Sequence, residues 1–145
     1  MQEIIGNIWE TDCDIICVTT NGVVKSNGEL VMGKGVALQA KQRYPILAKR
    51  LGNMVSLYEN KPYLIVYDNI KYDIISLPTK YHWRDKSDIE LIKNSLIIIK
   101  NMISEDHTIA LSRPGCGNGG LKWEDVKKVI EPILDDRFTV YSLKE

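Results

Sequence analysis

Apolar and polar positions along the chain predict several β-strands. Glu3–Ile5 and Asp14–Thr20 (DIICVTT) have strand-like patterns, and the second is a nearly continuous apolar run, typical of a strand buried on both faces. Thr108–Ser112 predicts a further strand, and the alternating segment Phe138–Leu143 predicts a final one.

Other segments show helical signals. Gly35–Arg43 and Pro45–Leu51 are predicted as two helices, because Pro45 breaks the first and can begin the second. Ser87 and Glu90 form an S-x-x-E capping box, which predicts a helix beginning at Ser87. Trp123–Leu134 is predicted as another helix. The apolar face of the helix after Ser87 consists of Ile89, Ile92, Leu96 and Ile99.

The middle of the chain is rich in β-forming residues. Met54–Tyr58, Tyr63–Tyr67 and Tyr72–Leu77 are predicted as strands, joined by turn signals at 60–62 and at Asp68-Asn69. Strands interspersed with helices indicate an α/β sandwich, and the hairpin-like middle indicates a mixed sheet. In such sheets ligands bind beyond the carboxyl ends of strands. The loops expected there are Thr20–Lys34, Pro78–Arg84 and Arg113–Lys122.

Length and composition limit the classes of function. A chain of 145 residues suits one domain. Its 19 basic and 19 acidic residues argue against a protein held to nucleic acid by bulk charge. No apolar run approaches the roughly 20 residues of a membrane span, and the polar N-terminus does not resemble a signal peptide. We therefore expect a cytoplasmic protein that does not associate with membranes.

The cysteines and histidines do not predict a metal site. The three cysteines are an odd number, which suits a reducing compartment, and Cys13 and Cys17 on a predicted strand suit small buried side chains. His82 and His107 have no cluster of further ligands around them. We expect neither a metal nor a cofactor.

Two glycine-rich segments come close to known nucleotide-binding motifs. The G-x-x-x-x-G-K pattern from Gly28 to Lys34 lacks the Ser or Thr that binds Mg²⁺, because Gly35 follows the lysine. The preceding strand also ends near Thr20, too early for a P-loop. A nucleoside triphosphate site is therefore disfavoured.

The second segment, RPGCGNGGLKW, contains G-x-G-x-x-G at Gly115, Gly117 and Gly120. A dinucleotide-binding fold needs further strand–helix units after this motif, and only one strand remains. Both segments nevertheless lead into helix N-termini, whose free N–H groups favour anions. A diphosphate would suit two such loops, although two tight turns without a ligand is the alternative.

Taken together, five stretches resemble the macrodomain family, whose members bind ADP-ribose: IGNI, VTTNGV, VMGKGVALQAKQRYP, LPTKYHWR and PGCGNGGLKWEDV. The resemblance covers most of the chain and implies a single macrodomain over residues 1–145. It also implies a three-layer α/β/α sandwich with a central mixed sheet. The branch it resembles most contains terminal ADP-ribose glycohydrolases and an antitoxin that removes ADP-ribose from thymidine in DNA.

The resemblance implies a role for several individual residues. Asn7 matches a position that accepts a hydrogen bond from the adenine amino group, and Asn21 lies in the loop that lines the distal ribose. Gly33–Gly35 and Gly115–Gly119 match the two phosphate-contacting segments. The full set implied for ADP-ribose is Asn7, Ile8, Asn21, Gly33, Lys34, Gly35, Val36, Thr79, Pro114, Gly115, Cys116, Gly117, Asn118 and Gly119.

Lys80 matches the catalytic lysine of this branch, whose amine would attack or polarise the anomeric carbon of the distal ribose. The amine must be unprotonated to do so, which burial or cations such as Lys34 or Arg84 would favour. Human-type glycohydrolases carry an aspartate at the position of Gly119, so that acid is absent from this chain. The resemblance thus implies an ADP-ribosyl hydrolase acting on a nucleic-acid base or a protein carboxylate.

Several alternatives remain open. The chain could be a non-enzymatic ADP-ribose reader or a phosphatase for ADP-ribose-1″-phosphate. Trp83, with Arg84 and the neighbouring aromatic residues, could stack a base of single-stranded DNA, or it could pack under the adjoining loop. Cys116 suits a small filler better than a nucleophile paired with His82. We expect a monomer that binds ADP-ribose or an ADP-ribosylated macromolecule, either single-stranded DNA or protein.

Overall fold

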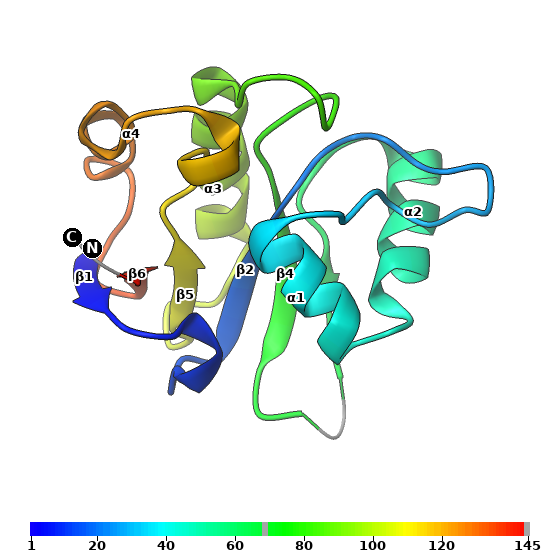
Figure 1. Ribbon diagram of the computed structural model, residues 1–145. Coiled ribbons are helices and arrows are strands. Elements are labelled where there is room, and N and C mark those ends of the chain that lie inside the picture. Colours follow the sequence, from blue (N-terminus) through cyan, green and yellow to red (C-terminus); the bar gives the residue numbers. More distant parts are fainter. Residues whose placement is uncertain (68–69, 144–145) are drawn as a thin grey trace.

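A six-stranded sheet forms the centre of the protein in a computed structural model, which describes residues 1–67 and 70–143. The strand order is β1-β6-β5-β2-β4-β3, and every pair is parallel except β3 with β4. Figure 1 shows the first five of these strands in this order. The strands are β1 (Gln2–Ile5), β2 (Ile15–Thr20), β3 (Leu64–Ile65), β4 (Asp73–Pro78), β5 (Ile109–Ser112) and β6 (Phe138–Ser142).

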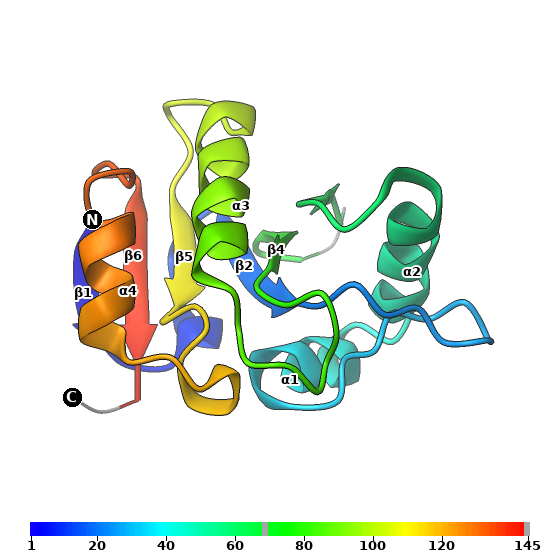
Figure 2. The same ribbon diagram turned by 90° about the horizontal axis from the view of Figure 1, so that it is seen from above.

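Helices cover both faces of this sheet. Figure 2 shows α3 and α4 together, apart from α1 and α2. Alternate residues of β2 point to opposite faces: Ile16 and Val18 pack with α1 and α2, whereas Ile15 and Cys17 pack with α3 and α4. The predicted three-layer sandwich with a mixed sheet is therefore confirmed. The helices are α1 (Gly35–Arg43), α2 (Leu47–Tyr58), α3 (Ile89–Met102) and α4 (Trp123–Ile130), with 3₁₀ turns η1 (Ile8–Glu10) and η2 (Gly117–Gly119).

The predicted strand Met54–Tyr58 is wrong, because α2 continues to Tyr58. Leu47 and Leu51 are fully buried, and Val55 packs against the same cluster. This four-residue spacing places one apolar stripe on the sheet, and that burial outweighs the β propensity of the segment. The predicted strand Tyr63–Tyr67 is shorter in the structure, where only Leu64 and Ile65 form a strand. The predicted turn at Asp68-Asn69 lies outside the described residues.

Two predicted helix boundaries also differ. Asp88, not Ser87, caps α3: its carboxylate accepts hydrogen bonds from the N–H groups of Glu90 at 2.9 Å and Leu91 at 3.1 Å. At the other boundary, α4 ends at Ile130 rather than Leu134. Pro132 explains the early end, because it lacks an N–H group and its ring clashes with the preceding turn.

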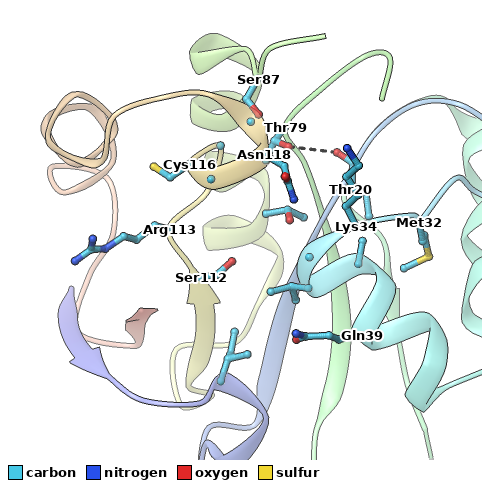
Figure 3. A pocket seen from close by; sticks show the side chains of 18 of the residues that line it. Thr20, Met32, Lys34, Gln39, Thr79, Ser87, Ser112, Arg113, Cys116 and Asn118 are labelled. Atoms are coloured by element: carbon cyan, nitrogen blue, oxygen red, sulfur yellow. Dashed lines mark hydrogen bonds between the residues drawn. The ribbon is translucent and has the colours of Figure 1, made fainter. Parts of the chain in front are cut away.

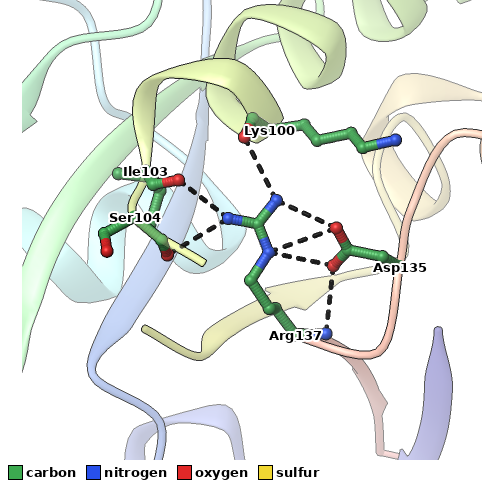
Figure 4. A network of polar contacts seen from close by, with 5 residues as sticks. All are labelled: Lys100, Ile103, Ser104, Asp135 and Arg137. Carbon is green, nitrogen blue, oxygen red and sulfur yellow. Dashed lines mark hydrogen bonds and ion pairs between the residues drawn. The ribbon is translucent and has the colours of Figure 1, made fainter. Parts of the chain in front are cut away.

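The C-terminal end of α3 is held by Arg137, which precedes β6 (Figure 4). Its guanidinium donates to the carbonyl oxygens of Lys100, Ile103 and Ser104 at 2.8–3.2 Å and pairs with the Asp135 carboxylate at 2.9 Å. Lys100 lies in the last turn of α3 and Ile103 is its C-cap residue, so this one side chain ties the end of α3 to the residues before β6. No helix among the described residues has the length and apolar character of a membrane span.

Candidate active site

The carboxyl ends of β2, β4, β5 and β6 lie at one edge of the sheet, because these strands are parallel. A cleft of about 1510 Å³ opens there (Figure 3). Of the residues predicted for the site, all except Pro114 line this cleft. Pro114 is buried and directly precedes Gly115. The fold thus gathers, from four separate loops, side chains that are far apart in the sequence.

Positive charge dominates the cleft. Five cationic side chains line it, whereas no aspartate or glutamate occurs among its described lining residues. This excess arises in a chain whose formal net charge is zero. A concave surface with cations and no carboxylates favours an anionic ligand. The five cations are Lys34, Arg43, Lys80, Arg84 and Arg113.

The first glycine segment exposes backbone at the start of α1. Gly33, Lys34 and Gly35 are all exposed, and Lys34 is the N-cap residue without a side-chain capping bond. The first N–H groups of α1 are therefore available to a ligand. A methyl group placed on Gly33 would meet no atom within 4 Å, so packing alone does not require glycine there.

The second glycine segment is packed much more tightly. Gly115 has φ of 78°, and a methyl group placed on it would lie 2.7 Å from Ile92 and 2.8 Å from Leu121. A methyl group on Gly119 would overlap the hydroxyl of Ser87. Gly117 and Asn118 are exposed, however, and form the turn η2 at the cleft. Packing therefore fixes the ends of this segment, while its middle faces the ligand space.

The two glycine segments face each other across the cleft. A methyl group placed on Gly35 would lie 3.8 Å from Nδ2 of Asn118. Lys80 lies beside them: its Nζ donates to the carbonyl oxygens of Trp83 at 3.3 Å and Asn118 at 3.5 Å. Its described contacts are thus carbonyl groups rather than a carboxylate. The predicted catalytic lysine and the predicted phosphate-binding loops lie together.

The segment before Lys80 is fixed to the end of β2. Thr79 donates to the carbonyl oxygen of Thr20 through its N–H at 3.0 Å and its hydroxyl at 3.4 Å. Thr79 and Thr20 are both buried, and the contact is drawn in Figure 3. This short connection holds the start of the lysine-bearing loop against the sheet.

The asparagines predicted for ligand binding also support local backbone. Asn7 accepts from the N–H of Trp9 at 3.0 Å and so caps η1, whose Ile8 is buried. Asn21 donates to the carbonyl oxygen of Val31 at 3.0 Å and accepts from the N–H of Val23 at 2.9 Å. Each amide retains hydrogen-bonding capacity, because its oxygen has two lone pairs and its nitrogen two protons.

The cysteines behave as packing residues in the structure. Burial raises the pKa of the Cys116 thiol, and its sulfur lies 3.8 Å from the carbonyl oxygen of Pro114. His82 does not line the cleft, and its ring accepts from the N–H of Arg84 at 3.2 Å. Cys17 is fully buried, whereas Cys13 is partly buried and lies just before β2 rather than on it.

Comparison with known proteins now decides the family. No protein-family profile matches the sequence. The solved structure of the macrodomain of Mycobacterium tuberculosis DarG is 30% identical, with a TM-score of 0.77, and the match covers 97% of this chain and 95% of that one. The chain belongs to the macrodomain family.

Two further relatives extend this finding. A DNA ADP-ribosyl glycohydrolase of Mycobacterium tuberculosis is 35% identical over 137 residues, which cover 85% of this chain and 35% of that protein. Thermosipho africanus DarTG, solved in complex with ADP-ribose, is 25% identical with a TM-score of 0.80, covering 96% of this chain and 40% of that one. This macrodomain thus spans about a third of the curated relative.

Sequence reasoning missed part of the macrodomain's cleft. Trp9, Gln39 and Arg43 line it as well: the indole N–H of Trp9 donates to Gln39 at 2.7 Å, and the Arg43 guanidinium lies 4.7 Å from the Trp9 ring centre. Their helical spacing could have indicated this, because Gln39 and Arg43 follow Gly35 at intervals of four and so lie on the same face of the helix. Also missed were Thr20, Met32, Ser87, Ser112, Arg113 and Tyr141.

Trp83, three residues after Lys80, is partly exposed. Trp83 lines the cleft and is 45% exposed, so it is not packed under the adjoining loop. The Arg84 guanidinium lies 5.0 Å from its ring centre. Tyr81 on the same loop is 61% exposed. An exposed aromatic surface joined to a cation suits stacking of a nucleic-acid base.

Proposed function

We propose that this macrodomain binds ADP-ribose and hydrolyses the bond between the distal ribose and a modified base of DNA. The observation that carries the proposal is the position of Lys80, hydrogen-bonded to the second glycine segment inside a cationic cleft. The names of the relatives, DNA ADP-ribosyl glycohydrolase and a DarTG complex with ADP-ribose, support the same ligand and reaction.

In this proposal the glycine segments bind the phosphates and Lys80 acts on the distal ribose. The exposed N–H groups at Gly35 and around Gly117 would hold the two phosphates, because they face each other and carry no side-chain obstruction. The distal ribose would then lie beside Lys80. Its amine attacks or polarises the anomeric carbon, and the bond to the base breaks with its electrons going to the leaving group. Water then adds to the anomeric carbon, which releases ADP-ribose and leaves the amine free, and a proton from water neutralises the departed base.

The leaving group must depart without help from a protein carboxylic acid. No aspartate or glutamate lines the described part of the cleft, and position 119 is glycine. A ring nitrogen of an imide or a carboxylate can leave as a stabilised anion, whereas the alkoxide of serine cannot. This chemistry favours an ADP-ribosylated base or acyl ester and disfavours ADP-ribosyl-serine.

The decisive experiment compares wild type with Lys80→Ala on ADP-ribosylated single-stranded DNA, on ADP-ribosylated protein carboxylates and on ADP-ribose-1″-phosphate. We expect Lys80→Ala to reduce release of ADP-ribose from DNA by about 10³-fold or more, because the attacking group is lost. Its affinity for ADP-ribose by calorimetry should stay within a few fold of wild type. Lys86→Ala is the matched control, since Lys86 lies on the same loop but does not line the cleft.

Other results would identify another function. ADP-ribose binding without turnover of any substrate would make the protein a reader. Phosphate release that survives Lys80→Ala would make it a phosphatase, and failure to bind ADP-ribose would remove the proposal altogether. A single domain over residues 1–145, a monomeric state and a cytoplasmic location stay predictions.

A further inference from the structure

Two loops behind the cleft hold the backbone that carries the catalytic lysine. The side-chain amide of Asn60 donates to the carbonyl oxygen of Lys80 at 3.1 Å. The N–H of Gly22 donates to the carbonyl oxygen of Tyr81 at 3.2 Å. Neither Asn60 nor Gly22 lines the cleft. The carbonyl groups of Lys80 and Tyr81 are thus both held by residues that do not line the cleft.

The groups around Gly22 leave little space for a side chain at this position. A methyl group placed on Gly22 would lie 3.0 Å from Nδ2 of Asn60 and 3.0 Å from the carbonyl oxygen of Tyr81. Any side chain at position 22 would therefore have to displace the amide of Asn60 or the carbonyl group of Tyr81. The loop after β2 and the loop after α2 meet at the backbone of the lysine loop.

Glu59, which precedes Asn60, has an unusual backbone conformation. Glu59 has φ of 79° and ψ of 178°, a region that residues other than glycine rarely adopt. It is the only non-glycine residue in the described chain with positive φ. This unusual turn directs the chain from the end of α2 so that Asn60 follows beside Lys80.

Asn60 also leaves a polar atom without a partner. Its side-chain oxygen is buried and accepts no hydrogen bond from any described residue. An orphaned buried acceptor is unfavourable, and leucine, whose side chain branches at the same carbon, would avoid it. The donated bond to Lys80 gives a reason for asparagine at this position despite that cost.

We propose that Asn60 is a positioning residue for Lys80, fixing the lysine backbone through its carbonyl group so that the amine stays beside Asn118. This inference rests on the proposed function of Lys80. The amine is separated from its own backbone by a flexible four-carbon stem, so a moved backbone displaces it from the reacting carbon. Asn60 acts through Lys80 and does not touch the ligand.

The test uses Asn60→Leu and Asn60→Asp, both of which remove the amide donor while keeping a similar shape. Asn53→Leu and Asn53→Asp are matched controls, because Asn53 is exposed on α2. We expect single-turnover release of ADP-ribose from DNA to fall about 10- to 100-fold in the Asn60 variants. Their affinity for ADP-ribose should stay within twofold of wild type, and the controls should keep wild-type rates.

The inference is overturned if the rates of both Asn60 variants stay within twofold of wild type. It is equally overturned if rate and ADP-ribose affinity fall together, since Asn60 would then support the whole cleft. Thermal melting identifies a variant that fails to fold, and the other variant then decides.

A second measurement does not depend on turnover. The NMR resonance of ¹³C-methylated Lys80, identified by its absence from Lys80→Arg, should shift in the Asn60 variants and stay in place in the Asn53 controls. If wild type releases no ADP-ribose, the proposed function fails, and this resonance alone decides the positioning role. An unshifted resonance then overturns it.

Discussion

Cationic side chains at the two ends of the sheet have opposite surroundings. At one end the side chain of Arg137 is 11% exposed, and its guanidinium donates to Asp135 and to three carbonyl groups at and just beyond the end of α3 (Figure 4). At the other end Lys34 has no ion-pair partner among the described residues and lies at the exposed start of α1. A paired cation stabilises the fold, whereas an unpaired cation in a cleft is available to an anionic ligand.

Gly119 and Gly33 also have opposite surroundings. Gly119 is enforced by its neighbour Ser87, but Gly33 has empty space where a side chain would be. Packing explains the first glycine but not the second, which we expect to allow close approach of a ligand. Substitutions at these positions should therefore separate effects on stability from effects on binding.

Arg137→Met should have the largest effect on stability. It leaves the carboxylate of Asp135 and the carbonyls at the end of α3 without their partner, at a cost of about 2–4 kcal/mol in the free energy of unfolding. Urea denaturation measures the loss. Because Arg137 does not line the cleft, ADP-ribose affinity of the folded variant should match wild type; an equal loss of affinity would show that the two ends are coupled.

The glycine pair should give the next largest effect. Gly119→Ala should lower the free energy of unfolding by about 1–3 kcal/mol, because the methyl group overlaps the Ser87 hydroxyl. Ser87→Ala in the same chain should recover at least part of that loss, since it removes the overlapping oxygen, which has no described hydrogen-bond partner.

Gly33→Ala, in contrast, should change stability by less than about 0.5 kcal/mol. Its affinity for ADP-ribose should fall about tenfold, equivalent to 1.4 kcal/mol. Calorimetry and thermal melting of the two alanine variants together test the contrast. Unchanged affinity in Gly33→Ala would mean that no ligand approaches the first segment.

Lys34→Gln should have a smaller effect on binding. Loss of one charged hydrogen-bond donor should raise the dissociation constant for ADP-ribose about fivefold at low salt, with stability unchanged. Because the side chain is exposed, the difference from wild type should shrink at high ionic strength. Binding isotherms at two salt concentrations test this, and an effect independent of salt would contradict a mainly electrostatic role.

The pH dependence of stability should show the smallest effect. Hydrogen bonding to Arg137 holds the pKa of the Asp135 carboxyl below its usual range. A depressed folded-state pKa stabilises the protein above the unfolded-state value near 4, and this contribution is lost as pH falls through the folded-state pKa.

Wild type should therefore exceed Asp135→Asn in stability near pH 6, and the difference should disappear on acidification. We expect less than about 1 kcal/mol, because Asp135 is 41% exposed and solvent screens the pair. Denaturation midpoints at several pH values between 2 and 7 provide the measurement. A difference that grows on acidification would contradict the assigned cause.

Local sequence signals predicted elements where propensity and burial agree. The continuous apolar run of β2 and the bounds of α1 match the structure closely, because both are encoded by neighbouring residues. The prediction of a strand at Met54–Tyr58 was wrong, because these β-forming residues continue the apolar stripe of α2, which only the packed core reveals. Ser87 failed as a cap because Asp88 competes for the same N–H groups.

The sequence by itself determined the alternating strands and helices, the two glycine segments and the resemblance that singled out Lys80. Only the tertiary structure decided which distant residues meet. The contact between Asn60 and Lys80 spans twenty positions, and the one between Lys80 and Asn118 spans thirty-eight. No local pattern encodes such pairs, because they depend on the order of parallel strands, which places the strand ends and their loops around one cleft.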